Sequence, residues 1–133
     1  MTLGQKTKVL VVDDQESFRM ILKNGLEKIG AYAVMTAEDG DRGLALVKSF
    51  RPDVIFLDVM MPRKSGADVA AELQDHDATA NIPVIFMTGL VQEKDIDSDS
   101  QQIGGREFLA KPFTLDQVVA KIKHAFPQSN SGT

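Results

Sequence analysis

The chain of 133 residues has no cysteine, no tryptophan and only two histidines. Without cysteine there is no disulfide and no thiolate ligand for a metal. The two histidines, His76 and His124, stand far apart in the sequence and do not make a zinc site. This composition is typical of a cytoplasmic protein, and we expect that location.

Long apolar runs and an excess of positive charge are also missing. No run approaches the roughly 20 residues of a transmembrane helix, and the N-terminus has no apolar signal-peptide region. We therefore expect no membrane insertion. The formal net charge is −4, which argues against direct binding of nucleic acid, because phosphate backbones are bound by clustered Lys and Arg.

Short apolar runs alternate with amphipathic segments of helical period. The runs predict buried strands over residues 8–12, 31–36, 53–57, 82–87 and 107–110. Helical periodicity predicts helices over residues 15–30, 39–50, 67–76 and 114–126. Residues 92–102 are almost entirely polar, and we expect a short or mobile helix there.

This order predicts an α/β fold, (βα)5, with a parallel sheet of five strands between two layers of helices. Apolar residues make up 43% of the chain, which is enough for a single domain with a real core. We expect that domain over residues 7–126, with flexible termini at 1–6 and 127–133.

Polar side chains follow four of the predicted strands where each strand ends. They are Asp13 and Asp14, Asp58, Thr88 and Lys111. Because the carboxyl ends of parallel strands meet at one edge of a sheet, we expect these side chains to lie together. Three carboxylates would repel one another unless a hard cation joined them. The pattern therefore predicts a divalent-metal site, with Thr88 and Lys111 placed to receive an anion.

Four segments at these strand ends carry a family resemblance. They are VLVVDD (9–14), VIFLDVMMP (54–62), VIFMTG (84–89) and FLAKPF (108–113). Together and in this order they resemble the receiver domain of two-component response regulators, of the chemotaxis-regulator type. The resemblance covers residues 7–126 and implies a flavodoxin-like fold with strand order 2-1-3-4-5.

The resemblance also implies a role for each matched residue. Asp58 matches the phosphoacceptor, which receives a phosphoryl group from a histidine kinase or a histidine phosphotransfer protein. Asp13, Asp14, Asp58 and the backbone carbonyl of Met60 match the ligands of Mg²⁺, for which Mn²⁺ is a substitute. Asp14 is the expected direct ligand, and Asp13 is expected to act through water.

Further roles concern the phosphoryl group, the conformational switch and partner docking. The resemblance implies that Thr88 and Lys111 contact the phosphoryl group, and that Thr88 and Phe108 form the switch. It implies partner docking at Gln15, Phe18 and Pro112. Both aromatic residues have a second interpretation, since Phe108 is also typical of a buried strand residue and Phe18 of a core residue.

The resulting hypothesis is a signalling phosphoacceptor and not an enzyme. It would catalyse its own phosphorylation on Asp58, slowly hydrolyse the product, and signal through contacts with an unknown downstream protein. The sequence leaves open whether the domain works alone or as part of a longer chain.

Three rival functions fit the sequence less well. A haloacid-dehalogenase-like phosphatase needs an Asp-x-Asp motif, and here Asp58 is followed by Val59 and Met60. A flavodoxin needs a phosphate-binding loop rich in Ser, Thr and Gly after the first strand, where this chain has DDQE (13–16). A receiver-like module that is never phosphorylated is disfavoured by the complete set of five polar residues.

Overall fold

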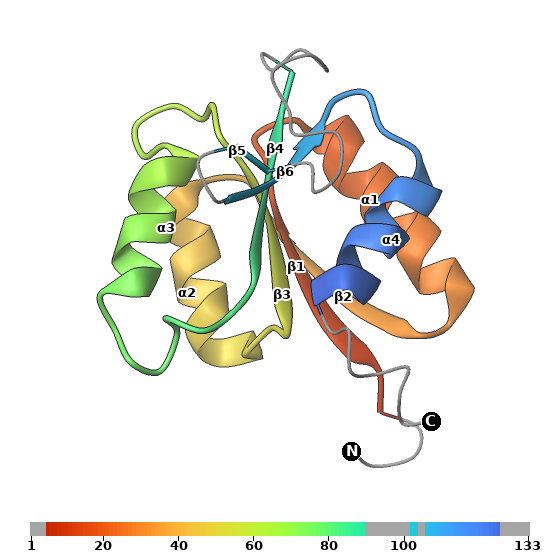
Figure 1. Ribbon diagram of the computed structural model, residues 1–133, viewed down its shortest axis with the longest axis horizontal. Coiled ribbons are helices and arrows are strands. Elements are labelled where there is room, and N and C mark those ends of the chain that lie inside the picture. Colours follow the sequence, from red (N-terminus) through yellow and green to blue (C-terminus); the bar gives the residue numbers. More distant parts are fainter. Residues whose placement is uncertain (1–4, 90–101, 104–105, 126–133) are drawn as a thin grey trace.

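Strands and helices alternate through the computed structural model, which describes residues 5–89, 102–103 and 106–125 (Figure 1). The strands are β1 (Thr7–Val12), β2 (Tyr32–Ala37), β3 (Val54–Asp58), β4 (Val84–Thr88), β5 (Gln102–Ile103) and β6 (Arg106–Ala110). The helices are α1 (Glu16–Ile29), α2 (Gly40–Phe50), α3 (Gly66–Gln74) and α4 (Leu115–Ala125).

The sheet has the order β2-β1-β3-β4-β6-β5. All neighbours from β2 to β6 pair in parallel, so the predicted flavodoxin-like order 2-1-3-4-5 is confirmed. The two-residue strand β5 pairs antiparallel with β6 and was not predicted. It begins at the last residue of the predicted polar helix 92–102. The rest of that segment lies outside the described residues.

Helices cover both faces of the sheet, with α1 and α4 on one side and α2 and α3 on the other (Figure 1). Successive side chains of β1 point to opposite faces of the sheet. Val9 and Val11 pack into the cluster that contains Leu26 of α1, whereas Leu10 and Val12 pack into the cluster that contains Leu46 of α2. A strand buried on both faces must be apolar at every position, which explains the continuous runs in the sequence.

Local capping residues set where the helices begin and end. Asp39 caps α2 by accepting a hydrogen bond from the backbone N–H of Arg42 at 2.8 Å. Ser65 and Asp68 form a reciprocal capping box at the start of α3. Gly30 ends α1 in the left-handed conformation, at a φ of 92°. No helix in the described ranges has the length and apolar character needed to cross a membrane.

Gly66, the first residue of α3, lies against the end of β3. A Cβ atom at this position would stand 2.4 Å from the backbone oxygen of Asp58. We expect Gly66→Ala to lower the free energy of unfolding by about 1–3 kcal/mol, the usual cost of overpacking. Gly89→Ala is the control, because nothing lies within 4 Å of its Cβ position. Chemical denaturation checks this, and equal stability of the two variants would contradict it.

Candidate functional site

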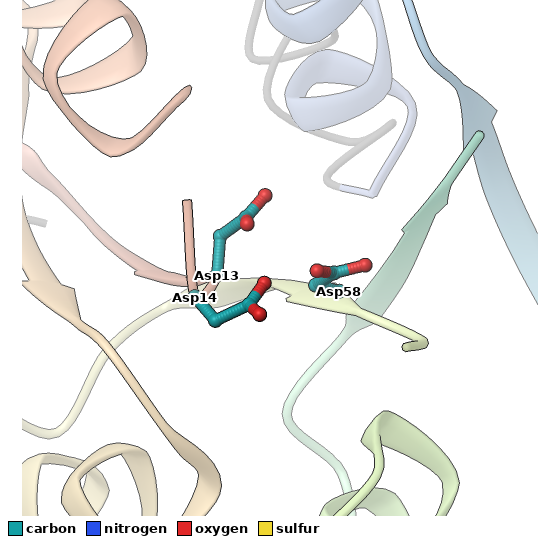
Figure 2. A group of neighbouring side chains, drawn as sticks. All are labelled: Asp13, Asp14 and Asp58. Carbon is teal, nitrogen blue, oxygen red and sulfur yellow. The ribbon is translucent and has the colours of Figure 1, made fainter. Parts of the chain in front are cut away.

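The side chains predicted from strand ends meet at the carboxyl edge of the sheet. Asp13 and Asp14 follow β1, Asp58 ends β3, Thr88 ends β4, and Lys111 follows β6. Figure 2 shows the side chains of Asp13, Asp14 and Asp58 gathered at this edge. Each of these three offers a carboxylate oxygen, and the oxygens all lie within 4.8 Å of one another.

A cavity of about 350 Å³ opens at the same place. The residues that line it are Asp14, Gln15, Asp58, Met60, Gly89 and Lys111. It joins an exposed acid, Asp14, to an almost buried one, Asp58, which is 5% exposed. A small ion or a phosphoryl group can therefore reach Asp58 from solvent past the side chains of Asp14, Gln15 and Lys111.

Lys111 supplies the positive charge of the site. Its Nζ lies 2.8 Å from Asp13 Oδ2 and 3.8 Å from Asp58 Oδ2. It also donates a hydrogen bond to Gln15 Oε1 at 3.3 Å and stands 4.2 Å from the centroid of the Phe18 ring. Asp13 is fully buried, so the ion pair is poorly screened by solvent and compensates a charge that would otherwise be costly.

The environment of Asp58 disfavours its charged form. Burial is the first cause and the charge of Asp13 the second, and together they raise the pKa of Asp58 to about 7. Lys111 and the backbone N–H of Met60, which donates to Asp58 Oδ1 at 3.3 Å, act in the opposite direction. Asp14 adds a smaller increase in the pKa. A cation beside these carboxylates would relieve the repulsion.

The donor set fits a hard divalent cation. All three acidic side chains offer oxygen, the ligand that Mg²⁺ prefers. Both oxygens of Asp13 already accept hydrogen bonds, from Lys111 Nζ at 2.8 Å and from the Gln15 N–H at 2.9 Å. Asp14 is exposed at the cavity wall. This difference favours Asp14 as a direct ligand and Asp13 as a ligand through water.

The two residues expected to form the switch lie on neighbouring strands. Thr88 is 2% exposed, and its backbone oxygen accepts a hydrogen bond from the Lys111 N–H at 2.9 Å. Phe108 is half-buried on β6, with its ring 5.4 Å from that of Phe86. The side chain therefore packs on the core, and its role in a switch stays a prediction.

The residues expected at a docking surface lie beside Lys111. Phe18 is half-buried, with its ring over the Lys111 ammonium and 5.8 Å from the ring of Phe113. Gln15 and Pro112 are exposed, and the peptide bond between Lys111 and Pro112 is cis. Both Gln15 and Phe18 thus contact the lysine of the site, a connection that the sequence interpretation missed.

Arg19 is a second residue that the sequence interpretation missed. Its Nη1 donates a hydrogen bond to the backbone oxygen of Asp13 at 2.7 Å. Arg19 lies one helical turn after Gln15 on α1, so the same helix face that reaches Lys111 also holds the loop that carries Asp13. The only signal in the sequence was this spacing, which is common on any helix.

The fold and the acidic pocket define a receiver of the flavodoxin-like type. Residues 9–123 match the family model of the response regulator receiver domain. The chain belongs to this family, whose members work in two-component signalling.

Curated relatives support the assignment. The chain is 36% identical over 128 residues to a probable transcriptional regulator, ycf27, of Guillardia theta, which covers 96% of this chain and 48% of the relative. It is 35% identical over 116 residues to the alkaline phosphatase synthesis transcriptional regulatory protein PhoP of Bacillus subtilis. That match covers 87% of this chain and 47% of PhoP. The chain thus spans about half the length of these relatives.

Solved structures agree with the fold. The chemotaxis protein CheY4 of Vibrio cholerae superposes with a TM-score of 0.77 at 28% identity, covering 91% of this chain and 99% of the other. The receiver domain of the Francisella response regulator 1452 gives a TM-score of 0.74 at 28% identity, covering 93% of this chain and 99% of the other. The resemblance in four sequence segments is therefore matched by the whole fold.

Because the pKa of Asp58 is raised, its ionised form should destabilise the metal-free protein at high pH. An unfolded aspartate titrates near pH 3.9, below the value of about 7 in the folded protein. Protonated Asp58 favours the folded state below pH 4, and this contribution is lost as pH rises through 7. In EDTA at pH 8, we expect Asp58→Asn to raise the free energy of unfolding by about 1–3 kcal/mol.

The gain from Asp58→Asn should shrink as the pH is lowered toward 4.5, because Asp58 is then largely neutral in the folded protein. Chemical denaturation across the pH range measures this difference. Asp77→Asn, at an exposed turn position, is the control for removal of one negative charge. A gain that is independent of pH, or a loss of stability at pH 8, would overturn the prediction.

Proposed function

We propose that this receiver domain accepts a phosphoryl group on Asp58 from the phosphohistidine of a histidine kinase or a histidine phosphotransfer protein. The observation that supports this most is the convergence of Asp13, Asp14 and Asp58 with Lys111 around one cavity. We further propose that the domain lies in the cytoplasm and that contacts to a downstream protein carry its output. The net charge of −4 is more compatible with protein contacts than with nucleic acid.

Asp14, Asp58 and the backbone carbonyl of Met60 are proposed to hold Mg²⁺, with Asp13 acting through water and Mn²⁺ as a substitute. Bound there, the cation supplies positive charge that offsets the carboxylates and the developing charge of the phosphoryl group. The cluster of carboxylate oxygens within 4.8 Å and the raised pKa of Asp58 support this assignment.

In the proposed reaction, an oxygen of ionised Asp58 forms a bond to phosphorus as the bond from phosphorus to the donor nitrogen breaks. The histidine nitrogen keeps the electron pair of that bond and takes up a proton. Lys111, 3.8 Å from Asp58 Oδ2, neutralises charge on the phosphoryl oxygens. Water later hydrolyses the acyl phosphate to phosphate and free Asp58, so the domain acts as a signalling acceptor with slow autodephosphorylation.

The switch is proposed to start at Thr88. Its hydroxyl would donate a hydrogen bond to the phosphoryl group and so favour a second arrangement of Phe108 on the neighbouring strand. Thr88 and Ala110 are paired in the sheet, and Phe108 lies two residues before Ala110. A preference of Thr88 for the phosphorylated state would shift the population between the two arrangements.

Two settings for this output are compatible with the comparisons. The curated relatives are named as transcriptional regulators and are about twice as long as the matched segment, so the domain would control a further part of a longer protein. The chemotaxis neighbour is matched over 99% of its chain, which fits a regulator made of the receiver alone. The chemistry at Asp58 is the same in both settings.

Phosphorylation by a small donor is the direct test. With acetyl phosphate or phosphoramidate and Mg²⁺, we expect intact mass to show one added phosphoryl group that hydroxylamine removes. Asp58→Asn should abolish the addition, whereas Asp53→Asn, an exposed aspartate at the opposite end of β3, should leave it unchanged. Equal labelling of the Asp58 variant at another residue would show that the acceptor is wrongly assigned.

Metal binding is tested separately by calorimetric titration of the unphosphorylated protein. We expect Mg²⁺ to bind weakly, since it keeps several waters and takes few protein ligands. Asp14→Ala should abolish the binding, and Asp13→Ala should weaken it by about tenfold or more, as loss of an outer partner of a metal site does. Unchanged affinity in both variants would exclude the acidic pocket as the metal site.

A further inference from the structure

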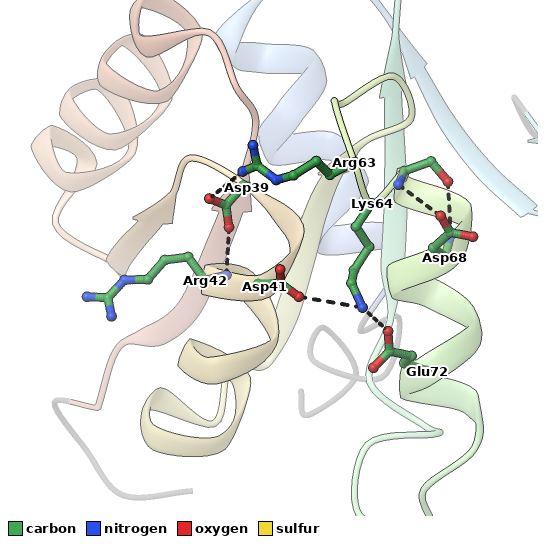
Figure 3. A network of polar contacts seen from close by, with 8 residues as sticks. Asp39, Asp41, Arg42, Arg63, Lys64, Asp68 and Glu72 are labelled. Carbon is green, nitrogen blue, oxygen red and sulfur yellow. Dashed lines mark hydrogen bonds and ion pairs between the residues drawn. The ribbon is translucent and has the colours of Figure 1, made fainter.

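The loop between β3 and α3 is tied to two helices by basic side chains. It covers residues 59–65 and carries Met60 two residues after Asp58. Figure 3 shows two side chains of this loop, Arg63 and Lys64, each directed at carboxylates outside it. Lys64 Nζ pairs with Asp41 Oδ1 of α2 at 3.5 Å and with Glu72 Oε2 of α3.

The Lys64 side chain is less exposed than that of Arg63, the other basic residue in Figure 3 that comes from this loop. It is 27% exposed, compared with 73% for Arg63, which pairs with Asp39 at 3.5 Å. Its stem lies against the first residue of α2, since a Cβ atom at Gly40 would stand 3.1 Å from Lys64 Cβ and Cδ. The hydrogen bond to Glu72 and the charge of Asp41 raise the pKa of Lys64, so it carries its charge at neutral pH.

The backbone fixes the two ends of the loop. The Val59 N–H donates to the Met87 oxygen at 3.0 Å, and the Gly66 N–H donates to the Val59 oxygen at 3.0 Å. Between these points, the Met60 N–H bonds Asp58 Oδ1 at 3.3 Å, while the Lys64 N–H bonds only within the loop, to Pro62. Side chains of the loop must therefore supply much of its attachment to the helices.

We propose that Lys64 is a positioning residue for the metal site. By joining the loop to α2 and α3 at once, it holds the backbone of Met60 beside Asp58 in the arrangement that binds the cation. This inference rests on the proposed function, because it concerns the cation that Asp14 and Asp58 would hold. Lys64 itself does not line the cavity at Asp58, so it would act on the cation only through the loop backbone.

Positioning and simple electrostatics predict opposite effects of removing Lys64. Loss of a positive charge makes the region more negative, which by itself attracts a divalent cation more strongly. Loss of the attachment lets the loop move and weakens the site. A fall in Mg²⁺ affinity on neutralisation of Lys64 is therefore evidence for positioning and cannot arise from the change in net charge.

The experiment compares Lys64→Gln with Lys48→Gln by calorimetric titration with Mg²⁺ at low salt. Lys48 is exposed on α2, and its replacement removes the same charge. We expect the dissociation constant of Lys64→Gln to rise about two- to fivefold, the range that the loss of exposed ion pairs corresponds to. Lys48→Gln should bind as tightly as the wild type or slightly more tightly, and Lys64→Arg should restore most of the affinity.

Amide hydrogen exchange in the metal-free proteins gives a second measurement. The amides of Met60, Met61 and Lys64 should exchange faster in Lys64→Gln than in the wild type, with the protection of β1 and β3 unchanged. Glu72→Gln should accelerate the same amides, which keeps the test valid if Lys64→Gln folds poorly.

The possible outcomes separate the two proposals. If the wild type binds no Mg²⁺ and gains no phosphoryl group, the proposed function fails. If the wild type does both, but Lys64→Gln matches Lys48→Gln in Mg²⁺ affinity and in amide exchange, the positioning role of Lys64 is wrong and the proposed function stands.

Discussion

The ion pair between Lys111 and Asp13 is the interaction on which the site depends. It joins residues 98 positions apart in the sequence at 2.8 Å. In the sheet, β3 and β4 lie between the strands that these residues follow. Lys111 therefore reaches across the carboxyl edge and offsets the charge of a fully buried carboxylate, which is costly to leave unpaired. The same ammonium lies near Asp58, so the charge that stabilises the resting site also stands where an anion would arrive.

The sheet makes this concentration of charge possible because it separates an apolar core from a polar edge. Along β1 and β3, all residues from Val9 to Val12 and from Val54 to Leu57 are buried and apolar. Polar groups are confined to the ends of these strands, where the backbone turns into loops. Parallel order brings several such ends together, which is why ligand sites in these folds lie beyond the carboxyl ends of the strands. Burial of Asp13 and Asp58 then follows from the packing of the strands below them, whereas Asp14 stays exposed.

Much of this arrangement could be predicted from the sequence, because strands buried on two faces leave continuous apolar runs and their ends are visible as polar residues. The order of the five parallel strands and the meeting of the five polar residues followed from that pattern and from the family resemblance. The antiparallel strand β5 could not be predicted, since two residues carry no periodicity. The sequence also did not show that Lys111 would pair with Asp13 more closely than with Asp58, or that Phe18 would cover its ammonium. These contacts of Lys111 depend on where helix α1 packs against the sheet.

Two shells of charge surround Asp58, and they differ in what they control. Burial raises the pKa of Asp58 most, and the inner group of Asp13, Asp14 and Lys111 then adjusts its protonation and its attraction for ions. The outer pairs of Lys64 with Asp41 and Glu72 do not line the cavity, and their charges are not a cause of the raised pKa of Asp58. Their proposed effect is through the backbone that links Lys64 to Met60, whose N–H donates a hydrogen bond to Asp58. In the proposed metal site, residues that never touch the ion would still affect its binding, since the position of one loop backbone would decide whether the carboxylates and the carbonyl can bind it together.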